Sequence, residues 1–212
     1  MAVYDLQEQE QIEELTAWWK QYGKLALLVV IAAAAAWGGI EGWRYYQHKQ
    51  GLEAGELYAQ LQEAAGGGDR NKVRDIAAVI ADKYARTSYA EFAALAAAKA
   101  AFEAGDAAEA VARLQWVAEH ARDDETREIA RLRLAAALLD GKKYDDALQL
   151  LDAKHADALS ALYADLKGDV LVAKGKTREA RDAYQLALDK SDARSSYRAL
   201  IQIKLDALGS TQ

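Results

Sequence analysis

The three histidines, His48, His120 and His155, are the side chains best suited to acid-base or metal chemistry. They are scattered along the chain, and neither an H-E-x-x-H pair nor a carboxylate at metal-ligand spacing accompanies them. The sequence also lacks a G-x-S-x-G elbow, a phosphate-binding glycine loop and a dinucleotide fingerprint. We therefore expect no catalytic residues, no metal site and no cofactor, and the sequence does not predict an enzyme.

Two other patterns have structural interpretations. Acid pairs such as Asp123 with Asp124 precede predicted helices, where negative charge complements the helix dipole. The run from Gly66 to Gly68 lacks the lysine and the serine or threonine of a P-loop, so it predicts a flexible joint.

Composition indicates helices throughout. Alanine and leucine dominate, proline is absent, and β-branched and aromatic residues are too sparse for a large sheet. The fold class is therefore all-α. A net charge of -6 without a basic stripe argues against a nucleic-acid partner. The absence of cysteine excludes disulfides, thiolate zinc sites and lipidated cysteines.

A membrane-spanning helix is predicted near the start of the chain. Residues 25–40 carry no charge, and the stretch from Tyr22 to Trp43 is about 33 Å long as a helix, enough for a bilayer core of about 30 Å. Aromatic residues lie on both sides of this run, as interfacial rings do: Trp18, Trp19, Tyr22, Trp37, Trp43, Tyr45 and Tyr46. We assign the transmembrane helix to residues 23–46 and expect the lipid bilayer to surround it.

Two alternatives to a span remain open. A cleaved signal peptide would have a basic start, but the first 22 residues are acidic and amphipathic. A buried core helix would explain the apolar run but not the flanking aromatic residues. Charge does not give the orientation, because Lys20 and Lys24 on one side balance Arg44 and Lys49 on the other.

Small residues inside the span suggest a partner in the membrane. Gly38 and Gly42 form a G-x-x-x-G pair, a spacing that lets another transmembrane helix approach closely. We treat both as candidate transmembrane packing residues. In an alanine-rich span such pairs also arise by chance.

The rest of the sequence contains a repeat marked by glycines. Gly105, Gly141 and Gly175 lie 36 and 34 residues apart, which is the period of tetratricopeptide (TPR) repeats. An alanine follows five residues after Gly105 and after Gly175, whereas the middle unit needs one extra residue before Ala147. We predict helical hairpins near 88–121, 124–154 and 157–190, preceded by a helix near 71–84 and closed by a last helix.

The predicted domain order follows from these patterns. It comprises an acidic amphipathic segment (1–22), the transmembrane helix (23–46), a stalk helix with a glycine hinge (47–68) and a TPR-like helical repeat domain (69–212). Gly168 is expected where the two helices of the last hairpin cross. An irregular helical bundle is the alternative to the repeat.

A stack of such hairpins has a concave surface lined by the first helix of each unit. Aligning the turn glycines places apolar residues on it, and an apolar groove would suit extended or unfolded polypeptide. The alternative is that these side chains are core. The candidate partner-binding residues are Phe92, Leu95, Phe102, Ile129, Leu132 and Leu139, with Leu162 and Val172 in the third unit.

The sequence resembles the YfgM-like ancillary subunits of the bacterial SecYEG translocon over almost its whole length. The resemblance begins with the acidic stretch from Tyr4 to Glu14 and the Gly23-Lys24 pair ahead of the span. It continues with Gly42-Trp43-Arg44-Tyr45 at the end of the span, and with segments 132–135, 164–168 and 180–181 in the repeats.

The resemblance implies a single-pass protein of the bacterial inner membrane, with a cytoplasmic amino terminus and a periplasmic carboxyl-terminal domain. It further implies a chaperone-like, non-enzymatic role in helping newly translocated envelope proteins. Its implied partners are SecYEG, a membrane-anchored periplasmic chaperone of the peptidyl-prolyl isomerase type, and unfolded or nascent envelope proteins. A membrane-tethered TPR scaffold that assembles another envelope or cytoplasmic complex is the alternative function.

Overall fold

A computed structural model describes residues 2–209 of the chain, with side chains described for residues 16–25 and 27–209. All regular elements within these residues are helical, which confirms the predicted all-α class. They are α1 (Ala2–Gly66), α2 (Arg70–Lys83), α3 (Ser88–Glu103), α4 (Ala107–His120), α5 (Asp124–Asp140), α6 (Tyr144–Leu151), the short 3-10 helix η1 (Asp157–Leu159), α7 (Ser160–Ala173), α8 (Thr177–Lys190) and α9 (Ser196–Ala207).

The chain divides into two compact units, Met1–Gln50 and Gly51–Gln212. In the first unit, α1 exposes its apolar side chains, for example Leu28 at 64% and Val30 at 63%. Such exposure is unfavourable in water and favourable in lipid. Among the described residues, Leu27–Gly66 of α1 contains the one stretch that is long and apolar enough to cross a membrane, with a mean hydropathy of 1.3. The acidic side chains predicted to form an amphipathic start lie outside the described side chains.

The second unit begins inside α1, because residues 51–66 pack on α2. Leu61 and Ala64 of α1 are buried in one core cluster with Val73, Ala77 and Ile80 of α2. Residues 51–66 therefore form the first helix of an additional hairpin. The sequence interpretation had placed them in a stalk, and its domain boundaries at 22, 46 and 68 stay predictions.

A hydrogen-bonded turn connects the two helices of this first hairpin. The amide of Gly67 donates to the carbonyl of Glu63, and the amide of Asp69 donates to the carbonyl of Ala64, both at 2.9 Å. Gly68 has a φ of 76°, a left-handed conformation that glycine adopts without steric cost. The Asp69 side chain then caps α2 by accepting from the amide of Lys72 at 3.0 Å.

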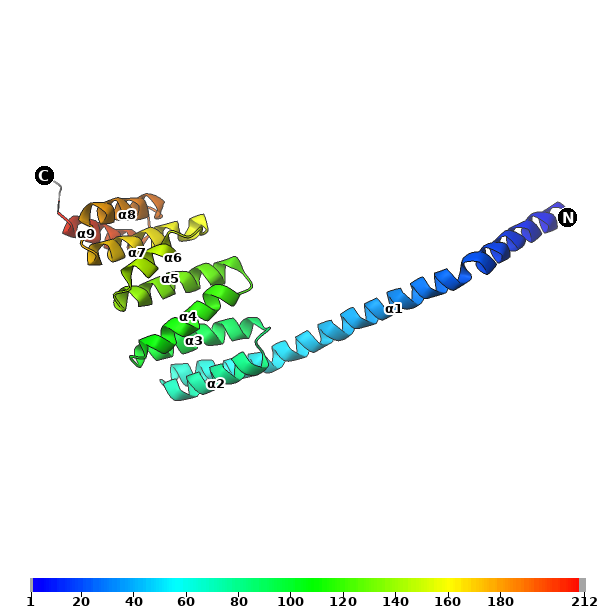
Figure 1. Ribbon diagram of the computed structural model, residues 1–212, viewed down its shortest axis with the longest axis horizontal. Coiled ribbons are helices and arrows are strands. Elements are labelled where there is room, and N and C mark those ends of the chain that lie inside the picture. The colour runs from blue at the N-terminus through cyan, green and yellow to red at the C-terminus, as the bar shows by residue number, and fades with distance from the viewer. Residues whose placement is uncertain (1, 210–212) are drawn as a thin grey trace. The chain divides into compact units, whose positions relative to one another are not determined.

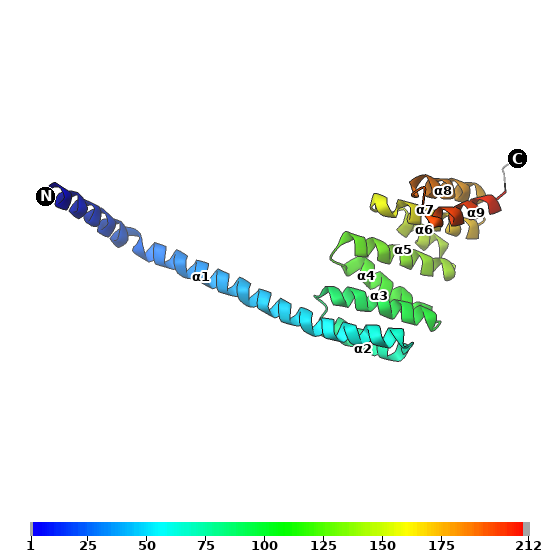
Figure 2. The same cartoon turned by 180° about the vertical axis from the view of Figure 1, so that it is seen from behind.

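Three further hairpins follow at the predicted places, α3 with α4, α5 with α6 and α7 with α8, and α9 packs on α8. The helices α2 to α8 follow one another along the unit in chain order, and α9 lies against α7 and α8 (Figures 1 and 2). The largest core cluster joins α3 through α7 and includes Leu114, Leu134, Leu138, Leu151 and Tyr163. A separate cluster holds α9 on α7 and α8 through Ile201, Leu205, Ala164 and Tyr184.

Left-handed residues between the paired helices set the register of the repeat. They are Gly68, Gly105, Lys142 and Gly175, with φ between 58° and 79°. Five residues after each comes a fully buried residue of the second helix: Val73, Ala110, Ala147 and Ala180. The middle turn is therefore centred on Lys142 rather than on Gly141. This corrects the extra residue that the sequence interpretation had placed before Ala147.

Candidate partner-binding surface

The register places the six predicted partner-binding residues at equivalent positions of α3 and α5. Phe92, Leu95 and Phe102 lie 13, 10 and 3 residues before Gly105. Ile129, Leu132 and Leu139 lie at the same distances before Lys142. Leu162 and Val172 of α7 occupy the outer two of these positions before Gly175. We call the residues at these three positions of each hairpin the first-helix face.

Exposure divides the first-helix face into two groups. Phe92 is 41% exposed and Phe102 is 50% exposed, which is high for a phenylalanine. Leu95, Leu132 and Leu139 are partly buried and pack against the largest core cluster. Ile129 is half-buried. The two rings and Val172, which is 41% exposed, are thus available to a partner, whereas Leu95, Leu132 and Leu139 also contribute to the core.

An aromatic cluster extends this face onto α1. The ring of Tyr58 lies 6.0 Å from that of Phe92 and 5.7 Å from that of Tyr89. The absence of a side chain at Gly55 leaves room for the Tyr89 ring, because a Cβ at position 55 would lie 3.1 Å from the Tyr89 hydroxyl. Sequence reasoning missed Tyr58 because residues 47–68 were interpreted as a stalk. The sequence does indicate Tyr58 as a member of the repeat, because it lies 37 residues before Leu95, and Leu95 lies 37 residues before Leu132.

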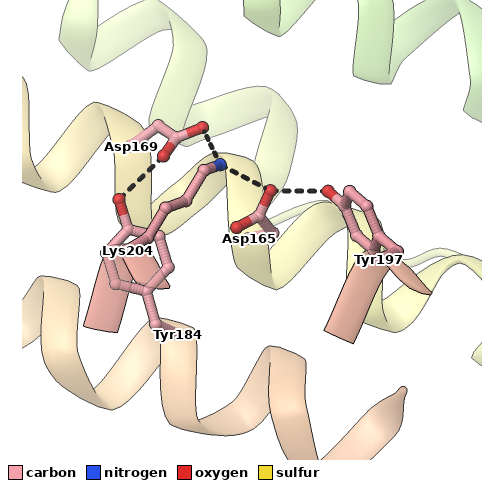
Figure 3. A network of polar contacts seen from close by, with 5 residues as sticks. All are labelled: Asp165, Asp169, Tyr184, Tyr197 and Lys204. Carbon is pink, nitrogen blue, oxygen red and sulfur yellow. Dashed lines mark hydrogen bonds and ion pairs between the residues drawn. The ribbon is translucent and has the colours of Figure 1, made fainter. Parts of the chain in front are cut away.

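At the other end of the unit, two carboxylates of α7 share one ammonium group and accept hydrogen bonds from two tyrosines (Figure 3). The ammonium group of Lys204 on α9 lies 2.8 Å from Asp165 and 2.7 Å from Asp169. Tyr197 donates to Asp165 at 2.5 Å, and Tyr184 donates to Asp169 at 2.7 Å. The other oxygen of Asp165, Oδ1, is buried without a hydrogen-bond partner.

These contacts change how the network titrates. Burial, followed by the hydrogen bonds to Asp169 and Asp165, raises the pKa of Tyr184 and of Tyr197. Burial alone would lower the pKa of Lys204, but its contacts with Asp165 and Asp169 outweigh burial and raise it. At neutral pH the charged lysine therefore pairs with both carboxylates at once, and these contacts hold α9 on α7.

The described residues offer little for metal or acid-base chemistry. No group of three or more His, Cys, Asp or Glu side chains in this part of the chain could hold a metal ion. The ring of His120 stacks on Trp116 at 5.2 Å, and that of His155 stacks on Tyr163 at 4.1 Å. Both of these histidines thus have packing roles.

The predicted transmembrane packing residues lie on an open part of α1. Gly38 and Gly42 are exposed, and a Cβ added to either would meet no atom within 4 Å beyond the adjacent residues and the surrounding helix backbone. Their contact with a partner's helix stays a prediction.

Comparison with known proteins agrees with this architecture. Residues 16–210 match the family described as a tetratricopeptide repeat-like domain. An ancillary SecYEG translocon subunit of Neisseria gonorrhoeae is 32% identical over 96% of this chain and 98% of its own length. Proteins of the same name from Haemophilus influenzae (30% identical, 87% of this chain, 90% of its own) and Escherichia coli (28%, 98% and 99%) are also similar. No solved structure is significantly similar.

The fold and the match to this family together define the class of protein: a tetratricopeptide repeat-like helical solenoid with an apolar amino-terminal helix. Since the similarity extends over nearly the full length of both chains, this chain belongs to the family of ancillary SecYEG translocon subunits.

Proposed function

We propose that the chain is a non-enzymatic ancillary subunit of the bacterial Sec translocon, acting as a periplasmic chaperone-like adaptor for newly translocated envelope proteins. The names of its relatives support the association with SecYEG. The exposed rings of Phe92 and Phe102 on the first-helix face are the observation that carries the chaperone-like part.

The proposed place of the protein is the inner membrane, with its amino terminus in the cytoplasm and the unit beginning at Gly51 in the periplasm. The apolar, exposed surface of α1 supports a membrane anchor. Protease added to spheroplasts should then digest the chain after about Gln50 and spare the first ~20 residues, which the bilayer shields. A large domain that survives such treatment would refute the periplasmic location.

Unfolded polypeptide is the proposed ligand of the first-helix face. Exposed aromatic rings lose water when they contact an apolar segment, and each Å² of apolar surface buried is worth about 25 cal/mol. Several such contacts would give weak binding that tolerates many sequences, as a chaperone-like adaptor requires. The aromatic cluster of Tyr58, Tyr89 and Phe92 adds to the apolar area of this face.

The decisive experiment separates this face from the core. Phe92→Ser and Phe102→Ser are made singly in the full chain in detergent, with Leu186→Ser as control because Leu186 is 50% exposed but lies on a second helix, α8. Thermal stability and binding to an unfolded envelope protein are then measured. We expect all three variants to keep their melting temperature and only the two phenylalanine variants to lose binding.

Other outcomes would contradict the proposal in distinct ways. Strong destabilisation by both substitutions would make the two rings core residues. Stable variants that bind like the parent would place the client site elsewhere.

Partner identity is tested separately, by purifying the protein from detergent-solubilised membranes and identifying what accompanies it. We expect SecYEG and a membrane-anchored periplasmic chaperone of the peptidyl-prolyl isomerase type. Recovery of another envelope or cytoplasmic complex without SecYEG would favour the alternative, a membrane-tethered TPR scaffold.

A further inference from the structure

A groove of about 580 Å³ lies between α4, α5 and α6, and none of the residues that line it belongs to the first-helix face. Its floor is α5, and its walls are α4 and α6. The apolar lining includes Leu134 and Leu138 from the floor and Val111 and Leu150 from the walls. The wall formed by α6 is short, because α6 has 8 residues whereas α4 and α8 have 14 each.

The floor of this groove departs from the repeat. Arg127 and Arg131 lie 15 and 11 residues before the left-handed residue Lys142. The neighbouring first helices carry small residues at the same two positions: Ala90 and Ala94 in α3, and Ser160 and Ala164 in α7. The first helix of the first hairpin, in α1, carries Glu53 and Leu57 at these positions. Cationic side chains at these two positions therefore occur in α5 and in none of the other three first helices.

The two arginines of the groove differ in whether their charge is paired. Arg127 forms an ion pair with Asp124. Among the described residues, no hydrogen bond or ion pair engages the side chain of Arg131, which is half-buried. The carboxylates of the walls, Glu119 and Asp146, are exposed and so are solvated and screened. Because a partly buried cation is screened less, Arg131 is the strongest attachment point for a charged ligand.

We propose that this groove binds an acidic amphipathic segment of a partner protein. The apolar side chains of the segment would lie on the partly exposed Val111 and Leu150, and one of its carboxylates would accept hydrogen bonds from the Arg131 guanidinium. Complementary charge gives such an interface its specificity. The site is distinct from the first-helix face and does not depend on client binding there.

The test uses the full chain in detergent micelles and two fluorescein-labelled peptides. One is an amphipathic helix of leucine and glutamate, and the other has glutamine in place of each glutamate. Binding is measured by fluorescence anisotropy for the parent, for Arg131→Gln and for a matched control, Arg133→Gln, which alters an exposed arginine of the same helix outside the groove. The net charge of -6 opposes nonspecific binding of the acidic peptide.

We expect the parent to bind the glutamate peptide about tenfold more tightly than the glutamine peptide. Arg131→Gln should remove most of that preference, and Arg133→Gln should retain it. Failure of the parent to bind the glutamate peptide, equal affinity for both peptides, or equal loss in the two variants would overturn the proposal. So would self-association of the parent that Arg131→Gln abolishes, since the occupant would then be a second copy.

Discussion

Gly168 of α7 lies directly beneath the phenol ring of Tyr184 on α8. A Cβ at position 168 would lie 2.9 Å from Cζ of that ring and closer still to two neighbouring ring carbons. The ring therefore needs a glycine opposite it. Its hydroxyl in turn reaches Asp169, so the contact also positions the network that holds α9.

Gly168→Leu should lower the free energy of unfolding by about 1 to 3 kcal/mol, because the added side chain would displace a buried ring. Urea unfolding of the fragment that begins at Gly51 measures the change. The control is Gly141→Ala, whose Cβ would meet its nearest atom at 3.4 Å, an ordinary contact. A Gly168→Leu protein as stable as the parent would show that α7 and α8 do not cross as described.

Lys142→Gly should stabilise the repeat unit by about 0.5 to 1 kcal/mol. Lys142 has a φ of 58°, where a side chain crowds the following carbonyl and glycine does not. The reciprocal change, Gly175→Lys, should cost about 1 kcal/mol, because Gly175 has a φ of 74°. Both effects are measured by urea unfolding, and equal stability of Lys142→Gly and the parent would count against the register centred on Lys142.

A fragment of residues 51–212 should fold, whereas a fragment of residues 69–212 should be markedly less stable. Removing residues 51–68 uncovers Val73 and Ile80, which are fully buried against α1. Each fully buried side chain of this size contributes about 1.5 to 3 kcal/mol. Thermal melting and binding of a hydrophobic dye distinguish the fragments, and equal melting temperatures would show that residues 51–66 are a stalk.

The stability of the unit should fall as pH rises above about 10. Tyr184 and Tyr197 have raised pKa values in the folded chain. The unfolded chain therefore loses these protons first, and unfolding releases protons at alkaline pH. The raised pKa of Lys204 acts with the same sign, since its stabilisation is complete below the unfolded pKa of about 10.4 and is lost as pH rises through the folded pKa.

Urea unfolding at pH 8, 10 and 11 measures this dependence. Tyr197→Phe should be less stable than the parent at pH 8, because Asp165 loses a hydrogen bond. It should also lose less stability between pH 10 and 11, because one fewer hydroxyl titrates. The same loss in the variant and the parent would show that Tyr197 does not contribute to the pH dependence.

Much of the fold could be predicted because Gly105 and Gly175 both adopt a left-handed conformation in the turn of a hairpin, and their spacing matches that of the repeat. The middle turn was misplaced by one residue because a lysine occupies the left-handed position and Gly141, beside it, has an ordinary φ of -75°. Glycine is more often left-handed than lysine, but this is only a statistical preference. The backbone geometry is therefore needed to show that Lys142, and not Gly141, is the left-handed residue.

The site was less predictable than the fold. The equivalent positions of Phe92 and Ile129 follow from sequence periodicity, but the degree to which each is covered depends on how neighbouring helices pack. Similarly, Asp165 and Lys204 are 39 residues apart, and nothing in their local sequence pairs them. The aromatic cluster was missed because Tyr58 lies in a helix that is continuous with the apolar segment.

Helices of the repeat unit pack mainly on their neighbours along the chain, and α7 has further contacts with α5 and with α9. The loss of α9 would therefore leave the contacts of α3 with α4 intact, and local opening can begin at one end without disrupting the other. Amide hydrogens of α5 and α7 should exchange with solvent most slowly, and those of α9 fastest. If two partners bind at separate hairpins, each would stabilise the hairpin that it contacts against local opening, with little effect on the distant hairpins.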